Sequence, residues 1–185
     1  MNEAVLGYLD FVVPAPRNAL ADARDAVAVV IGANRSTWRN KRIELNGRIV
    51  SPDNMAAISP AWSPTGVQLA FVAMPERSDP IGSEATRQEL MQRRIWTVNV
   101  LGEPQPVRLT DSAVFRDEQP LWSADGTHLL FARMDVRGRA SLWLITADGR
   151  SARQVVDELT PAPPDPLGFY GHIEWETWYD WWRRF

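Results

Sequence analysis

Two octapeptides lie 60 residues apart in this sequence: Ser59-Pro60-Ala61-Trp62-Ser63-Pro64-Thr65-Gly66 and Gln119-Pro120-Leu121-Trp122-Ser123-Ala124-Asp125-Gly126. They share a proline, a tryptophan, a serine and a glycine at matching positions. The match continues downstream at the same offset, with Leu69 and Leu129, Phe71 and Phe131, and Met74 and Met134. A fixed period of this kind indicates a repeat architecture in which each copy is one supersecondary unit.

Each copy is predicted to form four short strands separated by turns. The tryptophan ends a first strand, and the glycine turn leads into a second strand of alternating apolar residues. Third strands are predicted at 94–100 and 141–146, and short fourth runs follow at 107–110 and 153–156. Four antiparallel strands of this length are typical of one β-propeller blade, which buries both faces only by stacking on its neighbours.

A third, degenerate copy is predicted ahead of these two. Residues 25–32 have the pattern of its second strand, and 42–45 that of its third, with Asn46-Gly47 as a turn. Residues 13–16 stand at the first-strand position, but no Trp-Ser pair follows them.

The predicted fold class is all-β: a partial β-propeller of about three four-stranded blades with a short aromatic C-terminal helix. The predicted units are a degenerate N-terminal blade at 1–57, blades at 58–114 and 115–158, and a Pro-rich linker with the helix at 159–185. Closed propellers have about 4–8 blades, so three blades would leave open edges. The chain could be part of a longer propeller, pair with a second copy as a homodimeric ring, or cover the open face with its own tail.

The tail carries an aromatic stripe. Trp175, Trp178, Tyr179 and Trp182 fall at the i, i+3, i+4 and i+7 positions of a helix, and we expect the tail to dock through them. The receiving surface could be the chain's own propeller, a partner or second protomer, or a membrane interface. The polar side of this helix is partly acidic, which disfavours an anionic membrane surface.

The motif Pro-x-Trp-Ser-Pro-x-Gly-x-x-Leu-Ala-Phe, followed by Ile-Trp-x-Val and later Leu-Thr, resembles the TolB-like β-propeller repeat. Similar blades occur in the propeller domains of prolyl-oligopeptidase-type serine peptidases. The resemblance covers residues 58–157. Thr65 stands where the family usually has Asp, and Ala124 where it has a second Pro, so the departures concern turn geometry. The resemblance implies a periplasmic or extracellular location, although the sequence shows no signal peptide.

Composition excludes several classes of function. The 185-residue chain has no cysteine, which excludes disulfides and a cysteine nucleophile. Its net charge of −3 lacks the basic footprint of a nucleic-acid-binding protein. Two separate histidines, His128 and His172, predict no metal site. No Gly-x-Ser-x-Gly or nucleotide-binding glycine pattern occurs, so we expect no catalytic residue and no cofactor.

Charged residues in two segments are the candidate partner-binding residues. The connection from Pro75 to Arg93 is longer than its counterpart at 135–140, and long loops on rigid blades often carry recognition. The segment 116–119 is expected to border the central channel on the same side. The candidates are Glu76, Arg77, Arg87, Arg116, Asp117, Glu118 and Arg133.

The leading functional hypothesis is a non-enzymatic, TolB-like module that binds a protein or peptide partner. Two alternatives stay open. One is an accessory or gating propeller of a serine peptidase, and the other is a structural half-ring that assembles into a larger propeller.

Overall fold

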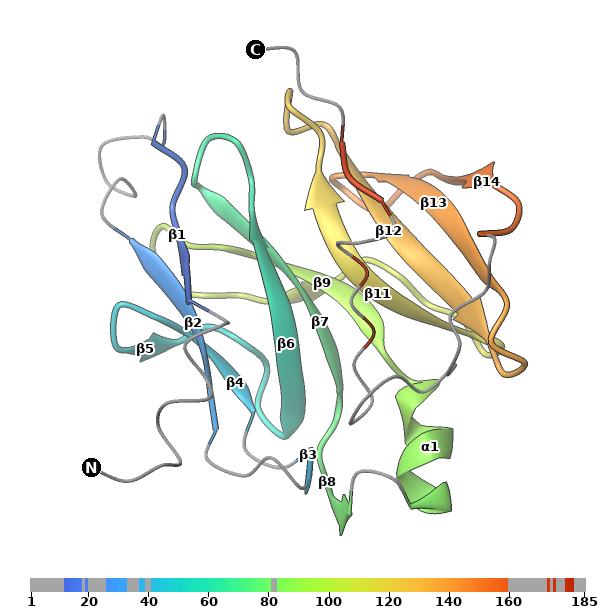
Figure 1. The fold of residues 1–185 in the computed structure, drawn as a ribbon. Helices are drawn as coiled ribbons and strands as arrows, with labels where there is room; N and C mark the ends of the chain where they lie inside the picture. The colour runs from blue at the N-terminus through green and yellow to red at the C-terminus, as the bar shows by residue number, and fades with distance from the viewer. Residues whose placement is uncertain are drawn as a thin grey trace.

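The structure is a computed structural model, and it describes residues 12–17, 19, 26–32, 37–38, 41–80, 83–159, 173, 175 and 179–181. These residues form three four-stranded antiparallel sheets, a two-stranded sheet and one α-helix. The three larger sheets lie side by side like the blades of a propeller (Figure 1). Within this part of the chain, no helix is long and apolar enough to cross a membrane.

Blade 1 is the degenerate copy, and it is a complete four-stranded sheet. Its strands are β1 (Val12–Pro14), β2 (Val27–Ile31), β4 (Arg42–Leu45) and β5 (Arg48–Ile49), in that order. The turn between β4 and β5 has φ values of +47° at Asn46 and +84° at Gly47. Two successive left-handed residues are what a tight two-residue hairpin requires, so the Asn-Gly prediction is confirmed.

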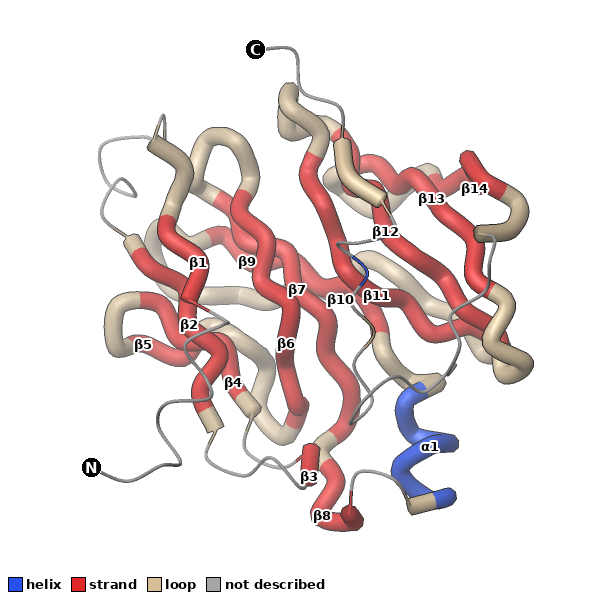
Figure 2. Tube along the Cα trace, in the orientation of Figure 1, coloured by secondary structure: helices blue, strands red, loops and turns tan. Residues whose placement is uncertain are grey.

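Blades 2 and 3 are the two well-matched copies. Blade 2 consists of β6 (Met55–Trp62), β7 (Gln68–Pro75), β9 (Arg94–Asn99) and β10 (Val107–Arg108). Blade 3 consists of β11 (Phe115–Trp122), β12 (His128–Asp135), β13 (Ala140–Thr146) and β14 (Ala152–Val156). The strands of each blade follow one another in chain order, as the path of the chain shows (Figure 2).

The long connection after β7 contains regular structure. It holds β8 (Arg77–Pro80), which pairs with β3 (Thr37–Trp38), and the helix α1 (Glu84–Leu90). Because β3 comes from the connection between β2 and β4, this small sheet links blade 1 to blade 2.

The first strands of blades 2 and 3 share a bulge at the repeat motif. Ser59 has φ of +54° and Gln119 has φ of +45°, and the pairing register shifts around each of them. The residue that follows each is a proline, which has no N–H to donate and is tolerated in a strand at such bulges. The repeat therefore extends to the backbone conformation.

Indole hydrogen bonds of one kind join each blade to the preceding one. Trp62 Nε1 donates to the Val13 carbonyl oxygen at 2.8 Å, and Trp122 Nε1 donates to the Ala61 carbonyl oxygen at 3.0 Å. Each motif tryptophan thus bonds the first strand of the blade before its own.

The main chain repeats a second contact between blades. Ala57 N donates to Lys41 O at 3.0 Å, and Asp117 N donates to Arg93 O at 3.1 Å. Ala57 and Asp117 are equivalent positions of the repeat, so blade 1 docks on blade 2 as blade 2 docks on blade 3.

An arginine makes a third repeated contact. Arg42 Nη1 donates to Met55 O at 2.6 Å, and Arg94 Nη1 donates to Phe115 O at 3.0 Å. Both arginines open the third strand of a blade, and both acceptors open the first strand of the next blade.

The main core lies between the blades. Leu69 and Phe71 of β7, and the equivalent Leu129 and Phe131 of β12, are all fully buried in it. A second cluster lies against the other face of blade 3. There, residues of β12 and β13 contact the C-terminal tail, whose described residues cross in front of β11 and β12 in Figure 1.

Candidate binding site

The predicted segment at 116–118 is buried. Arg116, Asp117 and Glu118 lie within β11 and are 2%, 0% and 2% exposed. The expectation that they line an accessible channel is therefore corrected, because they face a neighbouring blade or the tail. In blade 2 the positions equivalent to Asp117 and Glu118 are the apolar Ala57 and Ile58.

Glu118 pairs with two arginines. Arg93 Nη1 lies 2.6 Å from Glu118 Oε1, and Arg116 Nε lies 3.2 Å from the same oxygen. All three side chains are almost wholly excluded from solvent. Charges buried in this way persist only when they are paired, and the pair of Arg93 with Glu118 joins a residue of blade 2 to one of blade 3.

Arg133 has a structural environment of the same kind. Its Nε donates to Asp117 Oδ1 at 2.7 Å and its Nη2 donates to Asp117 Oδ2 at 3.4 Å. Its guanidinium carbon lies 4.5 Å from the centre of the Trp143 ring and 5.2 Å from that of Phe131. Burial raises the pKa of Asp117, and the hydrogen bond from Arg133 opposes that rise. We conclude that Arg133 holds Trp143 in place.

The other predicted charges lie elsewhere. Glu76 pairs with Arg42 at 2.5 Å, and Arg77 pairs with Glu89 of α1 at 3.7 Å. Arg87 is a position of α1, but its side chain lies outside the described residues. The six candidates whose side chains the structure describes therefore do not form a single site.

The tail packs on the chain's own blade 3. Trp175 and Tyr179 are 1% and 9% exposed and lie against Ala132 and other apolar residues of β12 and β13. Tyr179 N donates to Trp175 O at 3.3 Å, and these residues are four apart, as in the hydrogen bonds of an α-helix. Trp178 and Trp182, with most of the predicted helix, lie outside the described residues.

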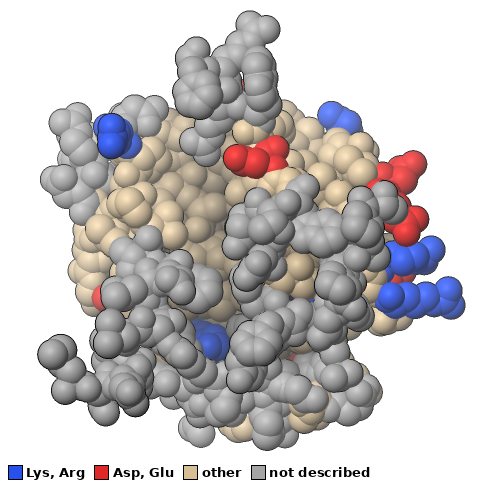
Figure 3. All heavy atoms as spheres, in the orientation of Figure 1, with Lys and Arg blue, Asp and Glu red and all other residues tan. Residues whose placement is uncertain are grey.

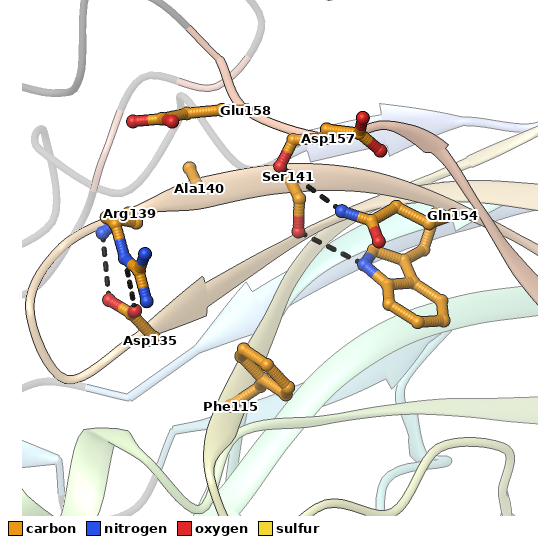
Figure 4. A pocket seen from close by; sticks show the side chains of 9 residues that line it. Phe115, Asp135, Arg139, Ala140, Ser141, Gln154, Asp157 and Glu158 are labelled. Carbon is orange, nitrogen blue, oxygen red and sulfur yellow. Dashed lines mark hydrogen bonds and ion pairs between the residues drawn. The ribbon is translucent and has the colours of Figure 1, made fainter.

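Blade 3 carries a surface pocket of about 200 Å³ (Figure 4). Its lining combines aromatic, amide and charged side chains from four strands and the segment after β14. The lining residues are Phe115, Asp135, Arg139, Ala140, Ser141, Trp143, Gln154, Asp157 and Glu158. In Figure 3, charged side chains of both signs gather at the right of the view, over blade 3.

Strand register brings the pocket residues together. Phe115 pairs with Asp135, and Trp143 pairs with Gln154. Directly paired residues of antiparallel strands share one face of the sheet. Trp143 also pairs with Phe131, which lies on the same face of β12 as Asp135, so all four side chains belong to the same side of blade 3. Trp143 is further fixed by a hydrogen bond of 3.1 Å from its Nε1 to Ser141 Oγ.

The acidic side chains of the pocket differ in their partners. Asp135 Oδ2 accepts a hydrogen bond of 2.9 Å from Arg139 Nε. Burial alone would raise the pKa of Asp135, but hydrogen bonds from Arg139 and Arg137 outweigh it and leave that pKa below its ordinary value. Asp157 and Glu158 are exposed.

An aromatic ring beside exposed carboxylates is suited to a cationic group, since both attract positive charge. Across the described ranges, no three His, Asp or Glu side chains are grouped so that they could hold a metal ion.

This pocket is not predicted by the sequence. Apart from the general expectation of charged recognition residues, nothing singled out Trp143, Gln154, Asp157 or Glu158. The available signal was the Asp157-Glu158 pair directly after the last strand of a blade. That signal becomes informative only once the pairing of β13 with β14 places it beside Trp143.

No protein-family model matches the sequence, and no curated protein sequence matches it. Solved structures do match. An oligogalacturonate lyase in complex with manganese has a TM-score of 0.50 and 15% identity, over 71% of this chain and 37% of that chain. TolB from Acinetobacter baumannii has a TM-score of 0.48 and 16% identity, over 75% of this chain and 32% of that chain. Oligopeptidase B from Leishmania major has a TM-score of 0.47 and 18% identity, over 82% of this chain and 19% of that chain.

These likenesses concern the fold alone. The chain spans less than two fifths of the length of each of these structures. The propeller-like arrangement expected from the repeat agrees with the three four-stranded antiparallel sheets of the structure.

Proposed function

We propose that the protein is a non-enzymatic binding module that docks a protein or peptide partner through the pocket of blade 3. The pocket is the observation that carries this proposal. It is open to solvent, and its lining comes from the strands of blade 3, which also carry the buried ion pair of Arg133 with Asp117. A rigid scaffold with a preformed polar and aromatic pocket is the usual setting for recognition.

The chemistry of the pocket favours a partner with a basic side chain. Asp157 and Glu158 supply negative charge, and Trp143 supplies an aromatic surface. The guanidinium carbon of the protein's own Arg133 lies 4.5 Å from the centre of the Trp143 ring, and an aromatic ring in general attracts cations. Since both carboxylates are exposed, the attraction should weaken as salt screens it.

Two peptides test the proposal. Both are Gly-Ser peptides of equal length, and they differ only in a central Arg or Glu. Titration followed by amide chemical shifts should show binding of the Arg peptide, with shifts at Trp143 and its neighbours, and no binding of the Glu peptide. The variant carrying Asp157→Asn and Glu158→Gln should bind the Arg peptide about tenfold more weakly, which corresponds to a loss of about 1.4 kcal/mol of binding free energy.

The matched control is Glu103→Gln. Glu103 is an exposed carboxylate whose side chain is 91% accessible and which lies in blade 2, far along the chain from the pocket. This change should leave the affinity for the Arg peptide unaltered. Equal binding of the two peptides, or an Arg peptide that binds the double variant as well as the wild type, would contradict the proposal.

A further inference from the structure

The C-terminal tail makes a contact that elsewhere in the molecule belongs to the next blade. Trp181 Nε1 donates to the Leu121 carbonyl oxygen at 2.9 Å. Leu121 is the residue of blade 3 equivalent to Ala61 of blade 2, and the Ala61 carbonyl accepts the indole of Trp122. Trp181 therefore bonds blade 3 in the way that the motif tryptophan of blade 3 bonds blade 2.

The main-chain contact between blades is also reproduced by the tail. Arg94 pairs with Ala73, and Ser141 pairs with Arg133, the residue 60 positions after Ala73. The residues just before them, Arg93 and Ala140, are thus equivalent. The Arg93 carbonyl accepts Asp117 N of the next blade, and the Ala140 carbonyl accepts Leu159 N of the tail at 2.8 Å.

Tyr179 completes the fit at the bulge of blade 3. Its hydroxyl donates to Gln119 O at 2.7 Å and accepts a hydrogen bond from Ala132 N at 3.0 Å. The register of β11 and β12 breaks at this point, so the hydroxyl satisfies backbone groups on both sides of the break. Around it, Ile173 and Trp175 are 7% and 1% exposed.

Blade 3 differs from the other blades in the third contact. The position of the arginine that reaches forward to the next blade, Arg94 in blade 2, is occupied in blade 3 by Ser141. A serine side chain is too short to span that gap. Hence this face of blade 3 keeps the two carbonyl acceptors of the repeated contacts, at Leu121 and Ala140, and lacks the arginine donor of the third contact.

We propose that this face of blade 3 is a docking groove for an aromatic segment. Its occupant is the tail of the same chain, which contacts the groove through Leu159, Ile173, Trp175, Tyr179 and Trp181 and takes the place of the first strand of a further blade. While the tail is bound, neither another blade nor a second copy docks there. Repeat arrays need terminal elements of this type, because a bare blade face exposes apolar surface. The groove meets the pocket at Ala140, but the Trp143 side of the pocket lies on the opposite face of β13 from Leu142.

A peptide added in trans tests the groove. The probe is a synthetic peptide of residues 165–185, and the receptors are the intact chain and a chain that ends at Pro164. The peptide should bind the shortened chain with one-to-one stoichiometry and should not bind the intact chain, whose groove is occupied. A peptide carrying Trp181→Ala should bind the shortened chain at least about tenfold more weakly, since it loses a hydrogen bond and an aromatic contact.

A second arm keeps the full chain and so does not depend on folding of the shortened one. Trp181→Phe removes the indole N–H from the tail of the intact protein and should make the groove accessible to the wild-type peptide. Trp96→Phe is the matched control, because the buried Trp96 Nε1 has no hydrogen-bond partner among the described residues. That control chain should bind no peptide.

Two results would overturn the proposal. One is peptide binding of equal strength to intact and altered chains, which would place the peptide at another surface. The other is a folded Trp181→Phe chain, with amide dispersion like the wild type, that binds no peptide.

Discussion

Arg93 and Glu118 form an ion pair of 2.6 Å in which the two side chains are 1% and 2% exposed. Arg93 directly precedes β9 of blade 2, and Glu118 lies in β11 of blade 3. The pair therefore crosses the boundary between two blades with both side chains shielded from solvent. Such a contact adds little over an apolar one, yet it cannot lose one member without leaving the other charge buried and uncompensated.

Glu118→Gln should therefore lower the free energy of unfolding by about 3–5 kcal/mol, as measured by urea titration of the circular dichroism signal. The exposed pair Arg48–Glu103 serves as the control, with side chains that are 45% and 91% accessible. Glu103→Gln should cost about 0–1 kcal/mol. Similar losses of unfolding free energy in Glu118→Gln and Glu103→Gln would show that the burial of Glu118 does not make its ion pair more costly to break.

Trp122→Phe should cost about 1–3 kcal/mol of stability. The substitution keeps most of the apolar ring but leaves the Ala61 carbonyl without the indole donor that lies 3.0 Å away. Thermal unfolding monitored by circular dichroism measures the loss. Trp96→Phe is again the reference, since its indole N–H has no partner in the described structure. A larger loss for Trp96→Phe would contradict the importance of the hydrogen bond.

Arg133→Lys should cost about 1–3 kcal/mol even though the charge is kept. Lysine cannot reproduce the two hydrogen bonds to Asp117 or stack its head group flat on Trp143. The same change at the exposed Arg137 should be neutral in the same denaturation experiment. If Arg133→Lys were also neutral, the planar geometry of the guanidinium would not contribute to the packing of Arg133 against Asp117 and Trp143.

The turn between β11 and β12 of blade 3 should contribute a stabilisation that depends on pH, through Asp125. Asp125 accepts hydrogen bonds from Ser123 Oγ at 2.7 Å and from Thr127 N and Oγ1 at 2.9 and 2.7 Å, and these lower its pKa from 3.8 to about 2. Because the folded pKa lies below the unfolded one, the stabilisation is full above pH 3.8 and is lost as the pH falls through about 2.

Asp125→Asn removes this titration. The melting temperature of the wild type should exceed that of the variant near neutral pH, and the difference should shrink steadily below about pH 4. A difference that stays constant from about pH 5 to about pH 2 would mean that the carboxylate is not responsible. Blade 2 has Thr65 at the equivalent position, so Thr65→Val should show no such pH dependence.

The blades could be predicted from the sequence because their signals are local. A tryptophan at a strand end, a glycine turn and an alternating apolar strand recur at a fixed offset, and β6, β7, β11 and β12 begin and end close to where that pattern places them. Blade 1 lacks the tryptophan, but its alternation and its Asn46-Gly47 turn were sufficient.

The buried charges could not be placed in this way. Arg116, Asp117 and Glu118 were read as accessible because charged side chains are rarely buried without partners. Their partners Arg93 and Arg133 come from other strands, and pairing across strands is invisible in a single sequence. Trp181 was missed for a related reason. The helical pattern of aromatic residues picks out the tail residues on either side of Trp181. Trp181 itself bonds Leu121, which lies 60 residues earlier, at the spacing of the blade repeat.

The two boundaries between blades differ in chemistry, and this difference gives them opposite responses to temperature. Where blade 3 has Asp117 and Glu118, blade 2 has Ala57 and Ile58. At these positions the boundary between blades 1 and 2 is therefore apolar, and the boundary between blades 2 and 3 is ionic. Apolar association weakens on cooling, while the penalty for desolvating ions falls on heating. Cold should therefore loosen blade 1 first, and at high temperature blades 2 and 3 should be the last pair to separate.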